Sequence, residues 1–468
     1  MTATLVSVIL SNYNGEAIAD VLRRSVGAVL QQSHPALELI LVDDGSSDAS
    51  PTLLQGLAGS DPRLRFVSTG RHQGIAAARN AGLALARGEH LAFIDNDAVP
   101  APDWLSILVE RLESDPTIGA CASRVMFADK PDVVNSVGSV LNRQAHGMGV
   151  GMFELDEFLD LPAELMYATG NGMIVRRAAL QATGPFDEGF RFYGHDDSDM
   201  GVRLRLCGYR IVPEPRAVLW HLHSFSKTQP GIRSWDDRNR LRFILKHYHW
   251  REMLRFALRD ASQRLRAPGR AGYLWAWLSN LRDLPPLLPY RWAHRRAGPF
   301  LARQAPFQEG PHGYLVRPDN RGMGSGFPPL GVLQAGSGDE AHLYLGWYWP
   351  QPVGRDGLLM RWGRRVSAVS FSLTRETRGL DLELVTPPAT GGGEVRALVR
   401  RQAADGWETA ATVGWRLAPA DYACQQLHCS QPLAPGNYRL ILIAERAYRE
   451  AGEFPRELGL GLISLKAR

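Results

Sequence analysis

The chain has few cysteines and no long apolar run. Four cysteines in 468 residues are too few for a disulfide framework, so we expect a reducing compartment, with the cytoplasm as the default. No apolar run approaches the ~20 residues that cross a bilayer. The N-terminus also lacks the basic region, apolar core and small-residue cleavage site of a signal peptide. These absences predict a soluble or surface-bound protein of the cytoplasm.

Length and composition predict several domains. A chain of 468 residues that is 45% hydrophobic can bury two or three separate cores. The net charge of +5 is spread unevenly, because residues 231–300 hold 15 Lys and Arg against 5 Asp and Glu. Pro, Gly and Ser are frequent in residues 317–339, as in a linker. We therefore predict an α/β domain over 1–230, a basic, aromatic-rich helical region over 231–316, a linker over 317–340 and a β domain over 341–468.

Short apolar runs alternate with helical patterns in the first hundred residues. The runs that read as buried strands are 5–10, 37–42, 64–67 and 91–94. Apolar residues recur at helical spacing between the first two runs, and residues 75–86 form an alanine-rich helical pattern between the last two. This alternation predicts a parallel sheet with flanking helices, in which ligands bind beyond the carboxyl ends of the strands.

Polar clusters follow three of these strands. They are Ser11, Asn12 and Asn14 after the first, Asp43 and Asp44 after the second, and Asp95, Asn96 and Asp97 after the fourth. Each cluster alone has an ordinary explanation as a helix cap or a turn. Carboxylates gathered at one edge repel each other, however, and a divalent cation relieves that repulsion. Hard oxygen ligands suit Mg²⁺ or Mn²⁺, and such an ion would neutralise a diphosphate leaving group.

The order of these blocks resembles family 2 glycosyltransferases, which have the GT-A fold. The resemblance covers roughly residues 4–250 and rests on VSVILSNYNGEA, LILVDDGSSD, GIAAARNAGLALARGEHLAFIDNDAVP and GNGMIVRRAALQATGPFDEGFRFYGHDDSDMGVRLRLCGYRI. Rhamnosyl- and galactofuranosyltransferases are the members that it resembles most. The resemblance implies that Asp95 and Asp97 bind the metal and the sugar nucleotide as a D-x-D motif. It implies a nucleotide-sugar site that also includes Ser11, Asn12, Asn14, Asp43, Asp44, Arg79, Asn80 and Asn96.

A second acidic motif, Asp196-Asp197, stands where family members usually carry Glu-Asp. An inverting transfer needs one carboxylate to take the proton from the acceptor hydroxyl while that oxygen attacks the anomeric carbon. The resemblance makes Asp197 the base, and Asp196 is the alternative. Ordinary packing of the helix that follows would also explain this motif. No feature suggests the covalent carboxylate nucleophile of a retaining enzyme.

The strand-like segment 218–220 leads into a His-x-His motif. In many relatives a histidine after this strand is a further metal ligand, and the resemblance places His221 there, with His223 as the alternative. An isolated histidine is more often structural, but a His-x-His beside an expected metal site favours ligation. An imidazole ligand would favour Mn²⁺ over Mg²⁺ modestly, and the identity of the metal stays open.

Basic and aromatic residues alternate after residue 231. The cations are Arg238, Arg240, Arg242, Lys246, Arg251, Arg255 and Arg259, and later Arg282, Arg291, Arg295 and Arg296. Two interpretations stay open: an element that contacts a membrane surface, or a solvated helical face with an aromatic stripe against the core. Nucleic acid is not expected as a partner, because no recognition motif accompanies the charge.

Short alternating strands separated by Gly and Pro turns fill the C-terminal part. They predict an antiparallel sandwich or jelly roll, and the segment LYLGWYWPQ with its flanks resembles a β-sandwich module appended to bacterial glycosyltransferases. Either sugar stacking or a packed core would explain Trp347, Tyr348, Trp349 and Trp362. The spacing of Cys424 and Cys429 is not that of a zinc site, so both are expected to be structural.

Together these features predict an inverting, metal-dependent hexosyl- or deoxyhexosyltransferase of bacterial cell-envelope polysaccharide synthesis. The donor would be a UDP- or dTDP-type sugar, the acceptor a glycan or lipid-linked saccharide, and the location the cytoplasm, with peripheral contact at the inner face of the membrane. The alternative is a catalytically inactive GT-A protein that binds carbohydrate or acts as a scaffold. A sugar nucleotidylyltransferase is disfavoured, because residues 11–16 contain no Arg or Lys for a phosphate loop.

Overall fold

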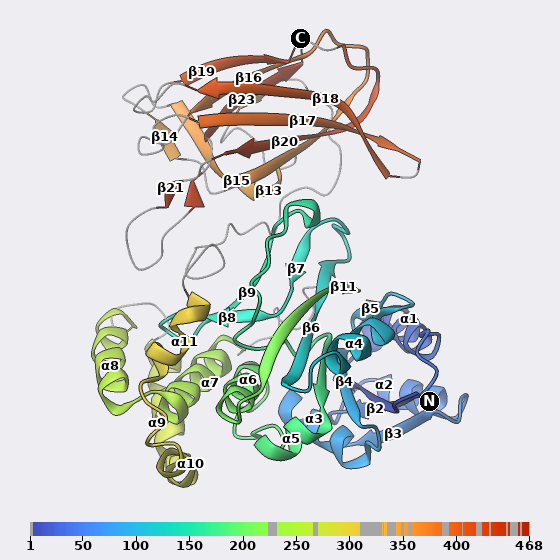
Figure 1. Cartoon of the computed structure of the whole chain (residues 1–468), viewed down its shortest axis with the longest axis vertical. Helices are drawn as coiled ribbons and strands as arrows, with labels where there is room; N and C mark the ends of the chain where they lie inside the picture. The colour runs from blue at the N-terminus through green and yellow to red at the C-terminus, as the bar shows by residue number, and fades with distance from the viewer. Residues whose placement is uncertain are drawn as a thin grey trace. The chain divides into compact units, whose positions relative to one another are not determined.

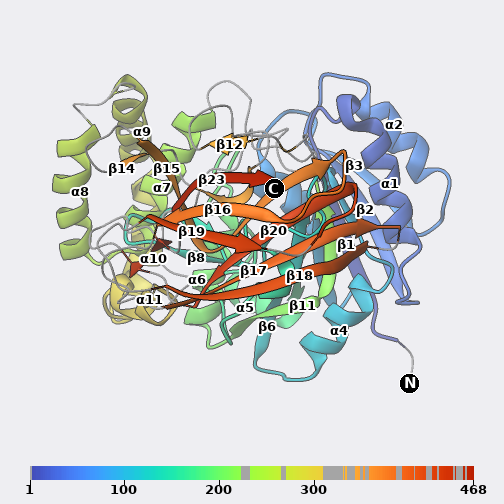
Figure 2. The same ribbon diagram turned by 90° about the horizontal axis from the view of Figure 1, so that it is seen from above.

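The structure is a computed structural model of the chain, which forms two compact units. Unit 1 comprises Met1–Met152 and Asp160–Gly313, and unit 2 comprises Phe153–Leu159 and Tyr314–Arg468. The residues described are 3–222, 232–264, 270–308, 330, 332–334, 343–347, 351–353, 358–385, 393–404, 406–417, 424–429, 432–445, 448–449, 457–458 and 461–467. Figures 1 and 2 show the elements of both units.

Unit 1 is built on a nine-stranded sheet with the order β3-β2-β1-β4-β10-β6-β11-β5 and with β7 paired to β6 (Figure 1). Its strands are β1 (Val6–Asn12), β2 (Leu37–Asp43), β3 (Leu64–Ser68), β4 (His90–Asp95), β5 (Ala98–Pro100), β6 (Ile118–Phe127), β7 (Val134–Ser136), β10 (Met173–Arg176) and β11 (Arg210–His221). The four predicted strands are confirmed, and they pair in parallel as β3-β2-β1-β4. Strand β10 lies antiparallel between β4 and β6. A separate hairpin consists of β8 (Ser139–Leu141) and β9 (Gly147–Gly149).

Helices cover both faces of this sheet. The helices of unit 1 are α1 (Ala19–Leu30), α2 (Ser50–Ala58), α3 (Ile75–Leu85), α4 (Trp104–Glu113), α5 (Arg177–Thr183), α6 (Asp196–Leu206), α7 (Ile232–His247), α8 (Trp250–Arg264), α9 (Arg270–Arg282), α10 (Leu288–Ala293) and α11 (Phe300–Gln308), of which α8, α9 and α10 lie to one side of the sheet. Among the described residues, short 3₁₀ turns span Glu16–Ile18 and Pro285–Leu287 in unit 1 and Asp156–Phe158 in unit 2. In β1, Val8 belongs to one buried core and Ile9 to the other, so the strand is apolar along its whole length. Of the helices that can be described, none has the length and apolarity needed to span a membrane.

Helix α7 lies inside unit 1, which corrects both interpretations of its cations. Arg238, Arg240, Arg242 and Lys246 are all buried. The carboxylate of Asp187 accepts hydrogen bonds from Arg242 at 3.0 Å and from Lys246 at 2.7 Å. Buried cations require such partners, and the partners come from distant parts of the chain that sequence spacing does not reveal. These four cations therefore neither face solvent nor touch a membrane.

Unit 2 is β-rich and antiparallel, as predicted. Its main sheet has the order β18-β17-β20-β15-β23-β16-β19. The strands are β12 (Val332–Gln334), β13 (Leu343–Trp347), β14 (Gln351–Val353), β15 (Leu358–Leu373), β16 (Leu380–Val385), β17 (Gly393–Ala403), β18 (Gly406–Leu417), β19 (Cys424–Cys429), β20 (Gly436–Ala444), β21 (Tyr448–Arg449), β22 (Glu457–Leu458) and β23 (Gly461–Ala467). The sandwich architecture and its sugar-stacking role stay predictions. Tyr348 and Trp349 lie outside the described residues, as do the side chains of Trp347 and Trp362.

Candidate active site

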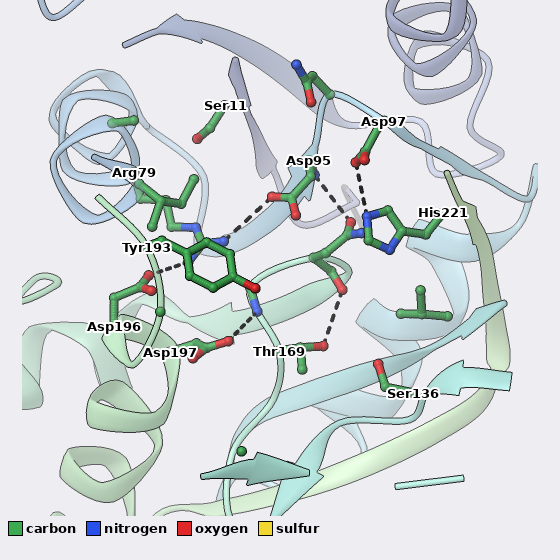
Figure 3. Close-up of a pocket in the computed structure, with 18 of the residues that line it drawn as sticks. Ser11, Arg79, Asp95, Asp97, Ser136, Thr169, Tyr193, Asp196, Asp197 and His221 are labelled. Atoms are coloured by element: carbon green, nitrogen blue, oxygen red, sulfur yellow. Dashed lines mark hydrogen bonds and ion pairs between the residues drawn. The ribbon is translucent and has the colours of Figure 1, made fainter. Parts of the chain in front are cut away.

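A pocket of about 450 Å³ opens at the carboxyl ends of β1, β2 and β4 in unit 1 (Figure 3). Parallel strands end there, so the polar residues that follow them meet at one edge. Ten of the predicted site residues line it: Ser11, Asn12, Asp44, Arg79, Asp95, Asn96, Asp97, Asp196, Asp197 and His221. The pocket therefore joins the two acidic motifs that lie about a hundred residues apart in the sequence.

Strand register brings Asp97 and His221 together. Asp95 ends β4, and Asp97 immediately precedes the short strand β5. Strand β5 pairs antiparallel with β11 so that Ala98 lies opposite His221. As a result, a carboxylate oxygen of Asp97 lies 3.1 Å from Nε2 of His221 (Figure 3). One ligand atom each from Asp95, Asp97 and His221 lie within 4.8 Å of one another.

The electrostatics of this cluster fit a divalent cation. Burial raises the pKa of Asp95, Arg79 opposes that shift, and Asp97 adds to it by repulsion. A bound cation would favour the ionised form of a buried carboxylate, because its positive charge offsets the solvation that burial removes. Two carboxylates and one imidazole are a donor set that Mn²⁺ and Mg²⁺ both accept. His223, the alternative ligand, lies outside the described residues.

Arg79 links the two acidic motifs. It lies on α3, is buried, pairs with Asp196 and has one guanidinium nitrogen 3.6 Å from Asp95 (Figure 3). Gly170 makes room for it, because a Cβ at that position would lie only 2.0 Å from Nη2 of Arg79. The guanidinium thus holds Asp196 and Asp95 at fixed positions on either side of the pocket.

Asp196 and Asp197 occupy the first turn of α6 but have different partners. His195 caps the helix in the left-handed region, with φ of 69°, and this turns both carboxylates toward the pocket. Asp197 accepts hydrogen bonds from the backbone N–H of Gly170 at 3.2 Å and of Ser198 at 2.7 Å. Burial, together with the charge of Asp196, raises the pKa of Asp197. Of these two carboxylates, Asp197 is therefore the one that no cationic side chain contacts at hydrogen-bond distance among the described residues.

At another part of the pocket, Asp44 contacts the loop of residues 72–74, beside two stacked aromatic rings. Its carboxylate accepts hydrogen bonds from the N–H of Gly74 at 2.7 Å and of Gln73 at 3.1 Å, and it lies 2.8 Å from Nδ1 of His72. The His72 ring stacks on Tyr13, with centroids 3.7 Å apart and planes 11° apart. A flat heterocycle such as a nucleobase fits beside rings of this kind.

With this geometry, comparison with known proteins is decisive for the N-terminal part. Residues 7–184 match the family described as Glycosyl transferase family 2. These residues form a glycosyltransferase family 2 domain. The matched stretch includes the D-x-D motif, whereas Asp196, Asp197 and His221 lie beyond its end. The resemblance to family 2 and the GT-A fold class are thereby confirmed over these residues, whereas the closer likeness to rhamnosyl- and galactofuranosyltransferases stays a prediction.

Curated relatives share this family 2 domain. The chain is 29% identical over 228 residues to the succinoglycan biosynthesis protein ExoO of Rhizobium meliloti, covering 47% of this chain and 62% of ExoO. It is 30% identical over 236 residues to the O-antigen biosynthesis protein RfbC of Myxococcus xanthus, covering 46% of this chain and 17% of RfbC. An uncharacterised protein of Sinorhizobium fredii is 31% identical over 219 residues, covering 44% of this chain and 24% of that protein. The chain thus spans less than two thirds of each of these relatives.

Solved structures give a weaker likeness. A mannosyltransferase of Pyrobaculum calidifontis in complex with GDP-Man and Mn²⁺ has a TM-score of 0.38 at 22% identity, covering 65% of this chain and 78% of that one. GalNAc-T7 with UDP, GalNAc and Mn²⁺ has a TM-score of 0.47 at 15% identity, covering 84% of this chain and 71% of that one.

Three predicted residues of the family 2 domain lie outside the pocket lining, within the described residues: Asn14, Asp43 and Asn80. Asp43 accepts hydrogen bonds from the backbone and hydroxyl of Ser46, and Asn14 accepts one from the N–H of Ser47 at 2.9 Å. The side-chain amide of Asn80 donates a hydrogen bond to the carbonyl of Phe186 and accepts one from the N–H of the same residue. All three hold together the loops around the pocket.

Sequence reasoning missed several lining residues, including Tyr13, His72, Tyr193, Asn135 and Asn171. The side-chain oxygen of Asn171 accepts a hydrogen bond from the N–H of Asp95 at 3.3 Å, and its buried amide nitrogen has no partner among the described residues. The same holds for the buried amide nitrogen of Asn135. Tyr13, Tyr193 and Asn171 lie inside motifs that were recognised, so their positions offered a signal. No sequence signal pointed to His72 or Asn135.

Proposed function

We propose that this chain is an inverting, metal-dependent glycosyltransferase that acts on a nucleotide-diphosphate sugar. The observation that carries this proposal is the meeting of the Asp95, Asp97 and His221 cluster with Asp197 in one pocket. A leaving diphosphate needs positive charge, and an attacking hydroxyl needs a base. This pocket offers a candidate for each role, carried on different strands and helices.

In this proposal Asp95, Asp97 and His221 hold Mn²⁺ or Mg²⁺. The ion, when bound, supplies positive charge that stabilises the leaving diphosphate. Asp97 and His221 are already held against each other, and Arg79 holds Asp95 from the other side. The chain therefore positions these ligands before the donor arrives, which lowers the reorganisation that binding requires.

The nucleoside of the donor is proposed to lie against Tyr13, His72 and Asp44. The rings offer a stacking surface, and Asp44 is fixed by two backbone N–H groups. Within the part of the chain that the structure describes, the amide nitrogens of Asn135 and Asn171 have no partner, and both residues line the same pocket. Hydroxyl or phosphate oxygens of the substrate would satisfy these donors, because buried polar groups without partners are costly.

Asp197 is proposed as the general base. Asp196 is paired with Arg79, so its carboxylate already has a cationic partner within the chain. Among the described residues, the hydrogen-bond donors to Asp197 are backbone N–H groups, and burial raises its pKa. A carboxylate with a raised pKa accepts a proton from an acceptor hydroxyl more readily. Two backbone hydrogen bonds also orient it within the pocket.

The proposed pathway is the synthesis of a cell-surface polysaccharide. Two relatives are named for succinoglycan and O-antigen biosynthesis, which supports a glycan or a lipid-linked saccharide as the acceptor. The donor would be of the UDP or dTDP type, with a rhamnosyl or galactofuranosyl group among the candidates. Such an acceptor would be used in the cytoplasm, at the inner face of the membrane when a lipid carries it.

A donor screen tests this proposal. The full chain is incubated with UDP-, dTDP- and GDP-sugars and Mn²⁺ or Mg²⁺, and nucleotide release is measured. We expect release from at least one donor, and loss of release in Asp95→Ala and Asp97→Ala, because each change removes a charge that holds the cation. Asp103→Ala, an exposed aspartate outside the pocket, is the matched control. No release from any donor would favour the inactive carbohydrate-binding alternative.

A further inference from the structure

Exposed apolar side chains gather in one segment of unit 1. All but one of the large hydrophobic residues that are exposed in the described part of the chain lie between Trp250 and Trp292. Leu258 and Trp292 are each 68% exposed. Helices α8, α9 and α10 carry them, and both views place these helices at the end of unit 1 away from β3 (Figures 1 and 2). Such a concentration marks an interaction surface rather than scattered surface residues.

The exposed apolar residues are spaced so that they form a stripe along each of two helices, α8 and α9. On α8, Trp250, Leu254 and Leu258 recur every four residues, so they lie along one face of the helix. Phe256 on the same helix is buried against the core. The two helix faces thus have separate roles, since one packs inside unit 1 and the other presents apolar side chains to the surroundings.

Helix α9 repeats this division. Leu274, Leu278 and Leu281 are exposed at helical spacing, whereas Tyr273 and Ala276 are buried. A helix that packs its core side well has no structural need for leucines on its outer side. The exposed leucines of α8 and α9 therefore indicate a surface that binds a partner.

Among the described residues of the same segment, the exposed charged side chains are all positive. Each acidic residue described between Trp250 and Arg296 is bonded to unit 1 itself: Glu252 accepts from the N–H of Phe300, Asp260 from the hydroxyl of Tyr273, and Asp283 pairs with Arg238. The exposed charged side chains of the segment are arginines, namely Arg251, Arg255, Arg282, Arg295 and Arg296. The surface is therefore both apolar and cationic.

Tryptophan and arginine are also paired on this surface. The guanidinium of Arg295 lies 3.9 Å from the centroid of Trp292, and that of Arg251 lies 5.2 Å from Trp250. An indole beside an arginine combines an apolar body with a charge, and such residues are favoured where hydrocarbon meets polar headgroups. The pairs stand at the ends of α8 and α10, next to the exposed leucines.

We infer that the outer faces of α8, α9 and α10 bind the surface of an anionic phospholipid bilayer. The leucines and tryptophans would enter the headgroup boundary, and the arginines would contact lipid phosphates. A second copy of the chain fits less well, because a two-fold dimer through this surface would place like charges opposite each other. This inference is independent of the glycosyltransferase proposal, although it would bring a lipid-linked acceptor near the enzyme.

Vesicle co-sedimentation of the full chain tests this inference. Vesicles of phosphatidylcholine alone are compared with vesicles containing phosphatidylglycerol, at low and high salt. We expect binding to the anionic vesicles that weakens with salt. The triple variant Trp250→Ser/Leu254→Ser/Leu258→Ser and the double variant Arg251→Glu/Arg255→Glu should each lower the partition coefficient by about tenfold or more.

Controls make the test decisive. Arg23→Glu/Arg24→Glu reverses the same charge on exposed residues of α1 and should bind vesicles as the unmodified chain does. Circular dichroism confirms that each variant is folded. The inference fails if folded protein does not prefer anionic vesicles, or if the α1 variant loses as much binding as the α8 variants. It also fails if light scattering shows a dimer in the unmodified chain that the α8 variants dissociate.

Discussion

Two adjacent carboxylates, Asp196 and Asp197, have different partners at the same helix end. Arg79 pairs with Asp196, and backbone N–H groups hold Asp197. The guanidinium fixes the orientation of Asp196. In the proposed mechanism, Asp197 exchanges a proton with the acceptor hydroxyl. The difference in partners, not a difference in residue type, would then separate a positioning role from a catalytic one.

Exchanging each carboxylate for an amide separates these roles. Asp197→Asn keeps the shape of the side chain but removes the basic oxygen, so we predict a loss of kcat of about 10² to 10⁴-fold with donor binding unchanged. Asp196→Asn should weaken the contact with Arg79 and affect acceptor binding more than proton transfer. Steady-state kinetics and donor titration measure both effects. Full activity in Asp197→Asn with a silent Asp196→Asn would exchange the two assignments.

The dependence of activity on pH provides a second test at this scale. Burial, with the charge of Asp196 nearby, raises the pKa of Asp197 to about 7. Because the base must be ionised to accept a proton, kcat should fall as the pH drops through this value, by about tenfold per unit below it. The profile of kcat against pH from 5.5 to 8.5 measures this. A kcat that is level down to pH 5.5 would show that another group acts as the base.

At the scale of elements, a short strand and a single helix turn complete the pocket. Strand β5 spans Ala98–Pro100, yet its pairing with β11 brings His221 to the D-x-D motif. Helix α6 begins at Asp196 and carries the proposed base in its first turn. Strand β5 is too short to carry a periodic pattern of its own, and its position follows from register with the longer strand β11.

The buried charges of α7 predict a stability effect that is separate from activity. Arg238 pairs with Asp283 and donates hydrogen bonds to the carbonyl of Gly189 and to the hydroxyl of Ser279. Removing one partner of a buried pair costs roughly 3 kcal/mol, because it leaves the other charge uncompensated. We therefore predict that Arg238→Met lowers the free energy of unfolding by about this amount in denaturant titrations.

Arg251→Met is the matched control for that change. Arg251 is exposed on α8, so its replacement should alter the free energy of unfolding by less than about 0.5 kcal/mol. Equal effects of the two substitutions would mean that the pairs of α7 contribute nothing beyond a surface charge.

Sequence patterns predicted most of the parallel sheet and much of the pocket. The strands from Val6 to Asp95 are apolar on both faces, and their ends carry the polar clusters, so both the sheet and its ligand edge follow from local pattern. Asn14, Asp43 and Asn80 carry the same chemistry but face their own loops. The direction in which such a side chain points depends on turn geometry and on long-range packing. The buried cations of α7 escaped prediction because their acids lie far away in the sequence.

At the scale of the whole molecule, every described residue of the pocket lining belongs to unit 1. Deleting residues 331–468 should therefore leave metal-dependent donor hydrolysis within about twofold. Transfer to a long or polymeric acceptor should fall, if unit 2 holds the glycan as its predicted role implies. Nucleotide release and product length measure the two activities, and circular dichroism controls for folding. Loss of hydrolysis in a folded truncation would overturn the predicted domain division.

The central claim is that Asp95, Asp97 and His221 hold a cation that binds the diphosphate of the donor. Calorimetric titration of UDP, dTDP and GDP into the full chain, with Mn²⁺ or with a chelator, tests it most directly. We predict that at least one nucleotide binds with Mn²⁺, and that its Kd rises by about tenfold or more, or about 1.4 kcal/mol, with the chelator and in Asp97→Asn. An equal Kd with and without metal, in both the unmodified chain and the variant, would contradict the claim.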